Sequence, residues 1–242
     1  KIRHIKKVCL IFYEEYVMAR RMSDKSKQIL HIGKGKDYVP YILTSEFNSL
    51  GTTSIIKDWK TGRDIHCMSQ GETMWYFLLR WDDSNIDIRE QFPLDNKITL
   101  KIADELGIKH PQDRNHIMTT DFLVTKSDNS LHAYSVKVDK NLNDRTVELL
   151  YIEREYWKYN GVPFDMLYAT DVNQVWVNNI RLVTEFYNKN AIYDKYSYVK
   201  HLIAVKEIDL DLSKTVIDNR KLDEILELSL IHISEPTRRT PI

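Results

Sequence analysis

The residues best suited to chemistry lie on two apolar segments that are close in sequence. Residues 118–124 are predicted to form one strand, with Asp121 near its start, and residues 132–138 are predicted to form its partner. Side chains alternate across a strand, so Ser135 and Lys137 share one face of the second segment. If the two strands pair through the short turn between them, Asp121, Ser135 and Lys137 converge on one patch.

A carboxylate and a lysine held on adjacent strands suit the metal-dependent hydrolysis of a phosphodiester. Carboxylate and carbonyl oxygens bind Mg²⁺, with Mn²⁺ as an alternative ion, and the backbone carbonyl of Val136 is a further candidate ligand. The metal lowers the pKa of a bound water, while the ammonium orients that water or stabilises developing negative charge. The alternative is the ordinary solvated face of a hairpin, where such residues are commonplace.

Two further carboxylates could reach this patch from helices. Ser69 and Glu72 have the spacing of a capping box, which predicts a buried, mostly apolar helix from there through Trp81. Glu72 would bring a second carboxylate to the metal, although capping alone would explain its position. Glu153 lies on a helix predicted over residues 145–160 and is either a third acidic member of the site or a solvated helical glutamate.

Other patterns argue against other chemistries. The histidines His66, His116 and His132 show no paired ligand spacing, which argues against zinc. No glycine-rich phosphate loop follows a predicted strand and opens a helix, which argues against an ATPase. We therefore expect no small-molecule substrate.

The charges are balanced overall but unevenly distributed. The chain has 35 basic and 35 acidic side chains, yet residues 1–36 hold ten Lys or Arg against three acids, a local charge of about +7. This basic segment could contact DNA phosphates through four of its side chains, or it could be an ordinary solvated helix, predicted over residues 13–27, and loop. The four candidates are Arg20, Arg21, Lys34 and Lys36.

Two further features indicate the compartment. Cys9 and Cys67 are the only cysteines and lack metal-type spacing, which favours a reducing environment without disulfides. No stretch approaches the roughly 18 apolar residues of a membrane span, so no membrane partner is expected.

The order of elements predicts an α/β protein. Besides the segments above, the patterns predict strands over 53–59, 64–68, 86–92 and 162–168 and a helix over 97–106, which together suggest a mixed sheet with helices on both faces. We place a domain boundary near Asp171, which separates a first domain over 1–170 from a mostly helical second domain over 171–227. Residues 228–242 look like a translated adapter sequence, so we expect a non-native tail and an incomplete second domain.

Several blocks of the sequence, in order and at similar spacing, resemble the TnsA endonuclease subunits of heteromeric transposases. The blocks span residues 35–40, 60–63, 87–94, 107–111, 120–124, 136–137 and 153–157. Collinear blocks over roughly residues 14–185 are far more specific than any one motif. The resemblance implies a restriction-endonuclease-like catalytic domain followed by a winged-helix-like domain.

The resemblance also implies residue roles. Glu72 and Asp121 would be metal-binding acids and Lys137 the catalytic lysine, while Glu153 matches an acidic residue near the family's site. The family has glutamine where this chain has Ser135, whose hydroxyl is shorter, so its part in metal binding is in doubt.

The implied activity is a Mg²⁺-dependent cut of the strand ending 5′ at each transposon end, made in a complex with the transposase TnsB and the ATPase regulator TnsC in the bacterial cytoplasm, at the nucleoid. Two alternatives stay open. One is a catalytically idle TnsA-like scaffold that docks the other subunits, favoured by Ser135 and the expected loss of the C-terminus. The other is a free-standing restriction-type endonuclease, for which no strongly basic recognition helix is visible.

Overall fold

The computed structural model describes residues 33–46, 52–111 and 115–234, with side chains described as far as residue 228. The helix predicted over 13–27, the candidate DNA contacts Arg20 and Arg21, and the last eight residues of the expected tail lie outside the described residues. The chain divides into two compact units between Val172 and Asn173. Each unit is described by itself.

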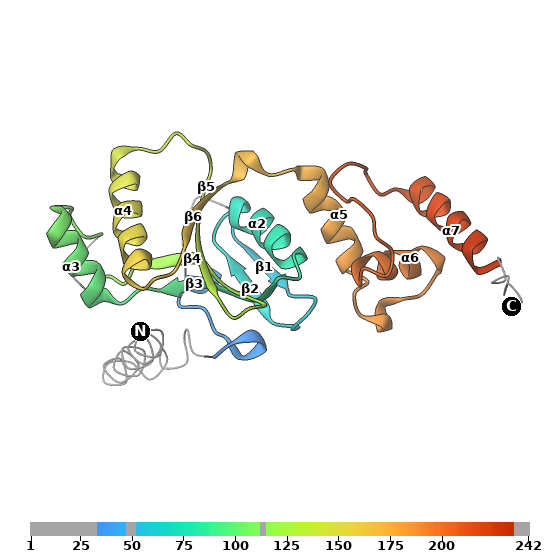
Figure 1. Ribbon diagram of the computed structural model, residues 1–242, viewed down its shortest axis with the longest axis horizontal. Helices are drawn as coiled ribbons and strands as arrows, with labels where there is room; N and C mark the ends of the chain where they lie inside the picture. The colour runs from blue at the N-terminus through green and yellow to red at the C-terminus, as the bar shows by residue number, and fades with distance from the viewer. Residues whose placement is uncertain (1–32, 47–51, 112–114, 235–242) are drawn as a thin grey trace, which may run out of the picture. The chain divides into compact units, whose positions relative to one another are not determined.

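A mixed four-stranded sheet forms the centre of the first unit (Figure 1). Its order is β3-β4-β5-β6, with antiparallel pairing from β3 to β5 and parallel pairing between β5 and β6. The predicted mixed sheet is therefore confirmed, and a separate antiparallel hairpin joins β1 to β2. The strands are β1 (Ser54–Lys57), β2 (Asp64–Cys67), β3 (Asn85–Pro93), β4 (Thr119–Lys126), β5 (Leu131–Lys137) and β6 (Phe164–Tyr168).

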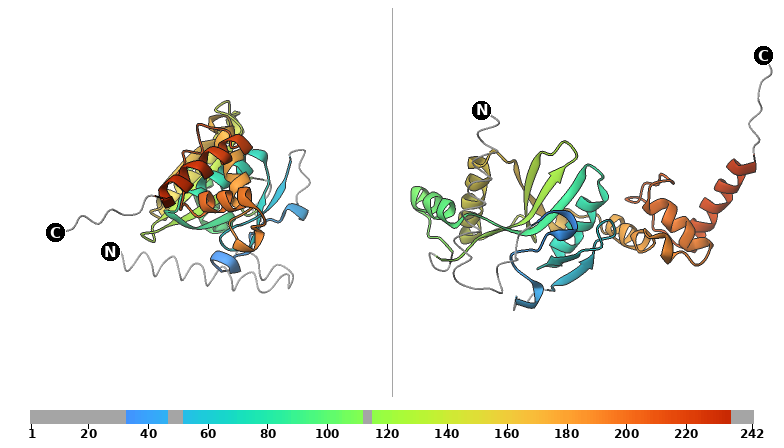
Figure 2. Two further views of the ribbon diagram at one scale, coloured as in Figure 1. Left: turned by 90° about the vertical axis from the view of Figure 1, so that its right-hand side faces the viewer. Right: turned by 90° about the horizontal axis from the view of Figure 1, so that it is seen from below.

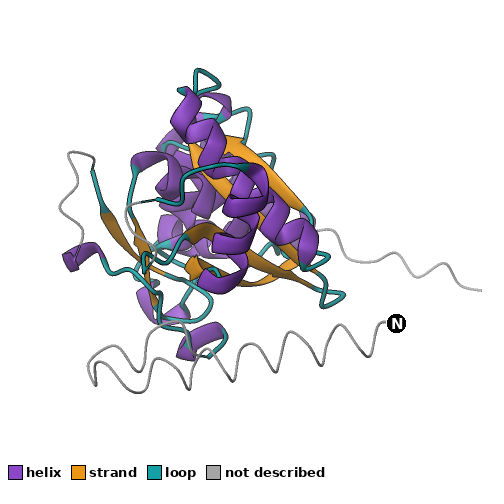
Figure 3. Cartoon of the chain, turned by 90° about the vertical axis from the view of Figure 1, so that its left-hand side faces the viewer, coloured by secondary structure: helices purple, strands orange, loops and turns teal. Residues whose placement is uncertain are grey.

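Helices cover both faces of the sheet, as predicted. Helices α3 and α4 lie on one face, and helix α2 lies with the β1–β2 hairpin on the opposite face (Figures 1 and 2). Seen from the side of α3 and α4, the helices lie in front of the strands (Figure 3). The three helices are α2 (Gln70–Trp81), α3 (Asn96–Leu106) and α4 (Asp144–Tyr159), and short 3-10 turns occur at η2 (Gly35–Asp37), η3 (Thr44–Glu46) and η4 (Ala169–Asp171).

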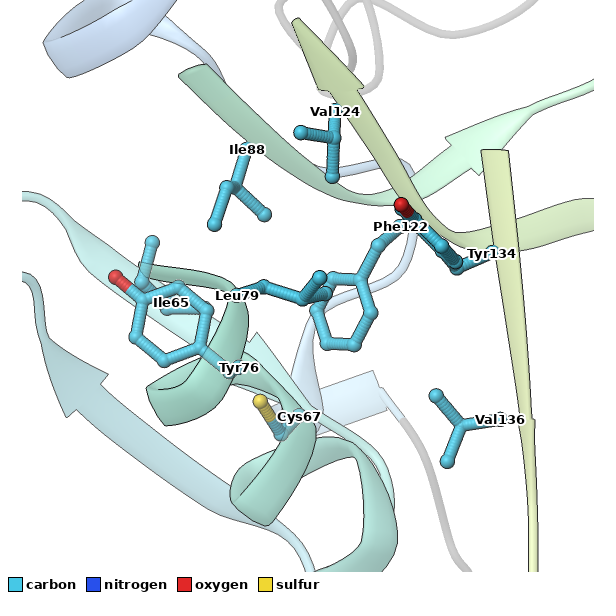
Figure 4. Packing of buried hydrophobic residues seen from close by; sticks show 9 residues of the cluster. All are labelled: Ile65, Cys67, Tyr76, Leu79, Ile88, Phe122, Val124, Tyr134 and Val136. Carbon is cyan, nitrogen blue, oxygen red and sulfur yellow. The ribbon is translucent and has the colours of Figure 1, made fainter. Parts of the chain in front are cut away.

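Side chains alternate across the sheet and divide the core into two clusters. The α2-side cluster is shown in Figure 4 and consists of Ile65, Cys67, Tyr76, Leu79, Ile88, Phe122, Val124, Tyr134 and Val136. The α4-side cluster consists of Leu94, Ile102, Ala103, Met118, Leu123, Ala133, Ile152, Tyr156 and Trp157. Burial of apolar surface on both faces is the main stabilising contribution to this unit.

A buried ion pair attaches the β1–β2 hairpin to the sheet. Arg63, in the hairpin turn, donates to both carboxylate oxygens of Glu90 on β3, at 2.7 and 2.8 Å, and also to the carbonyl of Ile88 at 3.0 Å. Glu90 is fully buried and also accepts from the backbone N–H of His66 on β2, at 3.1 Å. The carboxylate is thus satisfied by partners from the hairpin, as a buried charge requires.

Helix α2 lies unusually close to the sheet at its first turn. A Cβ atom at Gly71 would stand 3.1 Å from the Cβ of Ala169 and 3.2 Å from a methyl carbon of Val136 on β5. These separations are shorter than ordinary carbon contacts, so the glycine permits the approach. The next residue, Glu72, therefore lies in the turn of α2 that packs closely against Val136 of β5.

The second unit is helical where it is described. It contains α5 (Gln174–Thr184), η5 (Lys189–Ala191), α6 (Lys195–Ala204) and α7 (Asn219–Ser234). The side chain of Asn179 on α5 fixes the connection between α6 and α7, because it donates to the carbonyls of Leu212 and Thr215 and accepts from the N–H of Ile217. Residues 173–234 hold no strand, so the winged-helix-like character of this domain stays a prediction. Helix α7 crosses residue 228, where the expected tail begins.

Across the ranges that the structure describes, each helix is too short or too polar to cross a lipid bilayer.

Replacement of Arg63 by methionine should destabilise the protein by about 3–5 kcal/mol, because the Glu90 carboxylate would stay buried without its partner. The free energy of unfolding from urea denaturation measures this loss. Adding Glu90→Gln, which keeps an acceptor for the hairpin N–H, should recover part of it. The control is Arg145→Met, which breaks an exposed pair with Glu148 and should cost less than about 1 kcal/mol. Equal losses for Arg63→Met and the control would contradict the assigned role of the buried pair.

Gly71→Val should cost about 1–3 kcal/mol of unfolding free energy, since its side chain would overlap Ala169 and Val136. The neighbouring Gln70 is exposed, so Gln70→Val is the matched control at the same helix end. If both variants unfold at the same urea concentration, the close approach is not under steric constraint.

Candidate functional site

Asp121, Ser135 and Lys137 lie together where β4 and β5 diverge. The paired positions of these strands run only from Phe122↔Tyr134 to Thr125↔Leu131, so Asp121 stands just beyond the ladder. Its Oδ2 atom accepts from the backbone N–H of Val136 at 2.6 Å and from the Ser135 hydroxyl at 3.2 Å. The expected convergence of the three side chains is therefore present.

The ammonium group of Lys137 points into the same corner. It donates to the Ser135 hydroxyl at 2.8 Å and to the Val136 carbonyl at 2.9 Å, and it lies 3.6 Å from Oδ2 of Asp121. The side chains of Lys137 and Asp121 are 26% and 18% exposed, so both are reachable from solvent. A positively charged group is thus already held by the oxygens that the sequence predicts as metal ligands.

Glu72 is buried at the start of α2 and is held by three donors. Its Oε1 atom accepts from the Ser69 hydroxyl at 2.9 Å, and its Oε2 atom accepts from the backbone N–H of Met68 at 2.8 Å and from the Gln91 amide at 3.1 Å. Ser69 in turn accepts from the N–H of Glu72, as predicted for the cap. The carboxylate thus accepts from the side chain of the cap residue and from the backbone N–H of Met68, the residue before the cap. Capping and a place at the site are therefore compatible.

Glu153 is buried under the site and is not a solvated helical glutamate. It is 5% exposed and accepts from the Thr120 hydroxyl at 2.6 Å, and Trp157 donates to the same hydroxyl at 2.7 Å. Thr120 precedes Asp121, so α4 holds the start of β4 in place.

The site carries more negative than positive charge. Burial, followed by repulsion from Asp121, raises the pKa of Glu72 to about 7, and the same two causes raise the pKa of Glu153 to about 7. Burial lowers the pKa of the Lys137 ammonium, but the neighbouring carboxylates, Asp121 foremost, outweigh burial and raise that pKa above its ordinary value. Lys137 is therefore a cation at neutral pH.

The available oxygens fit a hard divalent cation. Oδ1 of Asp121 receives no hydrogen bond from the described residues, and Oε1 of Glu72 receives only that of Ser69. A cation placed between them would also relieve the repulsion that raises the Glu72 pKa. In the described part of the chain no three His, Cys, Asp or Glu side chains are grouped to bind one ion. A bound ion would therefore use the two carboxylates, the Val136 carbonyl and water, as Mg²⁺ commonly does.

The other candidates lie apart from this corner. Lys34 and Lys36 are exposed on either side of Gly35, whose N–H donates to Asp87 on β3 at 3.1 Å. Their contact with DNA stays a prediction. Among the histidines, His66 lies beside Thr44 at 3.1 Å, and His132 lies beside Asp165 at 2.8 Å.

The sequence interpretation missed Gln91, which lies inside the site and contacts Glu72. It belongs to the block 87–94 that supports the resemblance and to the strand predicted over 86–92, but no role was predicted for it from the sequence. Its backbone has φ +46, a left-handed conformation that no sequence signal indicates for a glutamine.

Two comparisons with known proteins show what the chain is similar to. The family model described as TnsA-like endonuclease, N terminal, matches residues 82–168, a range that includes Asp121, Lys137 and Glu153 but begins after Glu72. The chain is also 36% identical over 173 residues to the transposon Tn7 transposition protein TnsA of Escherichia coli.

That alignment covers 69% of this chain and 62% of the relative, so the chain spans less than two thirds of the length of the protein it matches. The residues that the family model matches, 82–168, include the four-stranded sheet and the Asp121–Lys137 corner. Both comparisons support a TnsA-type protein: residues 82–168 match a TnsA-like endonuclease model, and most of the chain is similar to TnsA of Escherichia coli.

Proposed function

We propose that this chain is a Mg²⁺-dependent DNA endonuclease, the subunit of a cut-and-paste transposase that hydrolyses the 5′-ending strand at each transposon end. The observation that carries the proposal is the corner where Asp121, Lys137 and the Val136 carbonyl meet, with Glu72 close enough for Asp121 to raise its pKa. This corner lies within a TnsA-like endonuclease region.

The side chains divide the work of phosphodiester hydrolysis. Glu72 and Asp121 would hold the ion through Oε1 and Oδ1, since their other carboxylate oxygens are engaged by backbone N–H groups. When bound, Mg²⁺ supplies charge withdrawal from the phosphate and a water of lowered pKa. Lys137 stays protonated, so it acts through its charge on the phosphate oxygens or on the water rather than as a general base.

The biological setting follows from the family. We propose that the DNA substrate is the transposon end, that TnsB cuts and joins the 3′ ends, and that TnsC engages the C-terminal region. Division of the two strand cuts between two subunits permits excision, whereas loss of the 5′ cut leaves a cointegrate. A chain with no net charge fits an enzyme that partners deliver to DNA at the nucleoid rather than one that its own field steers there.

One observation favours a second function, a catalytically idle TnsA-like scaffold. Ser135 stands at the corner where the family has a glutamine, and its hydroxyl is engaged by Lys137 and Asp121. Strand-specific cutting distinguishes the two functions. A scaffold would support 3′-end joining by TnsB without any 5′-strand cut by the wild-type chain.

Asp121→Asn and Glu72→Gln should each weaken Mn²⁺ binding by more than about tenfold, because each removes the charge of a ligand carboxylate. Isothermal titration of the metal-free chain with Mn²⁺ measures this. Asp165→Asn is the control, since Asp165 is an exposed carboxylate on β6 of the same sheet. If both site variants bind Mn²⁺ with wild-type affinity, Glu72 and Asp121 are not ligands of the metal.

Lys137→Ala and Asp121→Ala should reduce 5′-strand cutting by at least about a hundredfold and leave 3′-end joining intact. The assay combines the chain with TnsB, TnsC and Mg²⁺ on mini-transposon DNA and maps each nick on a denaturing gel. Lys126→Ala, at the opposite end of β4, is the lysine control and should cut normally. Complete excision by both site variants would show that the catalytic assignment is wrong.

A further inference from the structure

Gln91 has a backbone conformation that its residue type does not favour. Within the described residues, the non-glycine positions with positive φ are Gln91 at +46, Asn129 at +64 and Lys206 at +62. Asn129 lies in the turn between β4 and β5, and Lys206 follows the end of α6. Gln91 is the one within a strand, and it is 3% exposed. Such strain in a buried strand persists only where the surroundings enforce it.

The side chain of Gln91 bridges two elements of the site. Its Nε2 atom donates to Oε2 of Glu72 on α2 at 3.1 Å, and its Oε1 atom accepts from the hydroxyl of Thr119 on β4 at 3.1 Å. Thr119 is two residues before Asp121. The carbonyl of Gln91 also accepts from the N–H of Tyr41 at 3.3 Å. Both ends of the amide are thus used, and one of them is used by a predicted metal ligand.

The side chains of β3 and β4 change from one face of the sheet to the other at the position of Gln91. On β3, Ile88 packs in the α2-side cluster, whereas Phe92 packs against the α4-side cluster and Leu94 belongs to it. Strict alternation would keep positions 88, 92 and 94 on one face. The left-handed backbone at Gln91 lies between these positions and accounts for the exchange.

Strand β4 makes the same exchange opposite Gln91. Phe122 belongs to the α2-side cluster, but Met118 belongs to the α4-side cluster, and Thr120 bonds to Glu153 on α4. The paired positions Glu90↔Phe122 and Phe92↔Thr120 place Asp121 level with Gln91. Asp121 therefore lies at the crossing, where its side chain turns along the sheet toward β5 and bonds to the N–H of Val136.

We propose that Gln91 is a positioning residue of the metal site, which orients Glu72 through its amide and Asp121 through its left-handed backbone. The side-chain amide of Gln91 donates to Oε2 of Glu72, which leaves Oε1, whose partner is the Ser69 hydroxyl, as the oxygen directed to the ion. The exchange of faces brings an acid from β4 and an acid from α2 to the same end of the sheet. This inference rests on the proposed function, in which Glu72 and Asp121 bind a divalent cation.

The test measures Mn²⁺ affinity of the full chain by isothermal titration and, separately, its unfolding midpoint without metal. Gln91→Met keeps the side-chain length and removes both hydrogen bonds, and Gln91→Gly keeps the left-handed backbone and removes the side chain. We expect both variants to weaken Mn²⁺ binding about tenfold, as loss of a partner of a metal ligand does. Thr119→Val removes only the outer contact and should weaken binding less.

Two controls separate this inference from the proposed function. Asn129→Gly changes a left-handed position outside the site and should bind Mn²⁺ as the wild type does. Asp121→Ala should lose Mn²⁺ binding. If the wild-type chain binds no Mn²⁺, or Asp121→Ala binds it normally, the metal site itself is wrong and the role of Gln91 with it. If those two results are as expected but Gln91→Met and Gln91→Gly bind like the wild type, Gln91 is structural alone, whatever their unfolding midpoints.

Discussion

The contact between helix α2 and strand β5 at Gly71 is the constraint on which the site depends. The sheet alone supplies Asp121 and Lys137, and α2 supplies Glu72 one residue after the glycine. A side chain at that position would crowd the side chains of Ala169 and Val136, and the N–H and carbonyl of Val136 form part of the corner. Glycine therefore permits the close packing of the helix end that carries Glu72.

Hydrogen bonds around the site then hold the β1–β2 hairpin, β3 and Glu72 in position. The buried pair of Arg63 and Glu90 holds the hairpin to β3, and the next residue, Gln91, reaches across to Glu72. Charges are concentrated in the corner, because Glu72 and Glu153 each have a pKa raised to about 7 by burial and by Asp121. Buried carboxylates with surplus negative charge favour a bound cation, and the Lys137 ammonium offsets only part of that surplus.

Much of the fold was predictable because its signals are local. Apolar segments on either side of a short turn indicated strands β4 and β5, and the Ser69 cap with Glu72 indicated the start of α2. The Asp121–Lys137 corner followed from alternation and a short turn. The role of Gln91 was not predictable, because its left-handed backbone is imposed by the packing of two sheet faces rather than by its own propensity. The burial of Glu153 was left open for a similar reason, since its partner Thr120 lies 33 residues away in sequence.

The most direct measurement is the position of Mn²⁺ in crystals of the chain, located by its anomalous scattering. We expect an ion within about 2.2 Å of Oε1 of Glu72 and Oδ1 of Asp121, with the Val136 carbonyl and water completing its shell. Gln91 should still donate to Oε2 of Glu72 in the occupied site. An ion bound elsewhere, with both carboxylates uncoordinated, would show that Glu72 and Asp121 do not form the metal site.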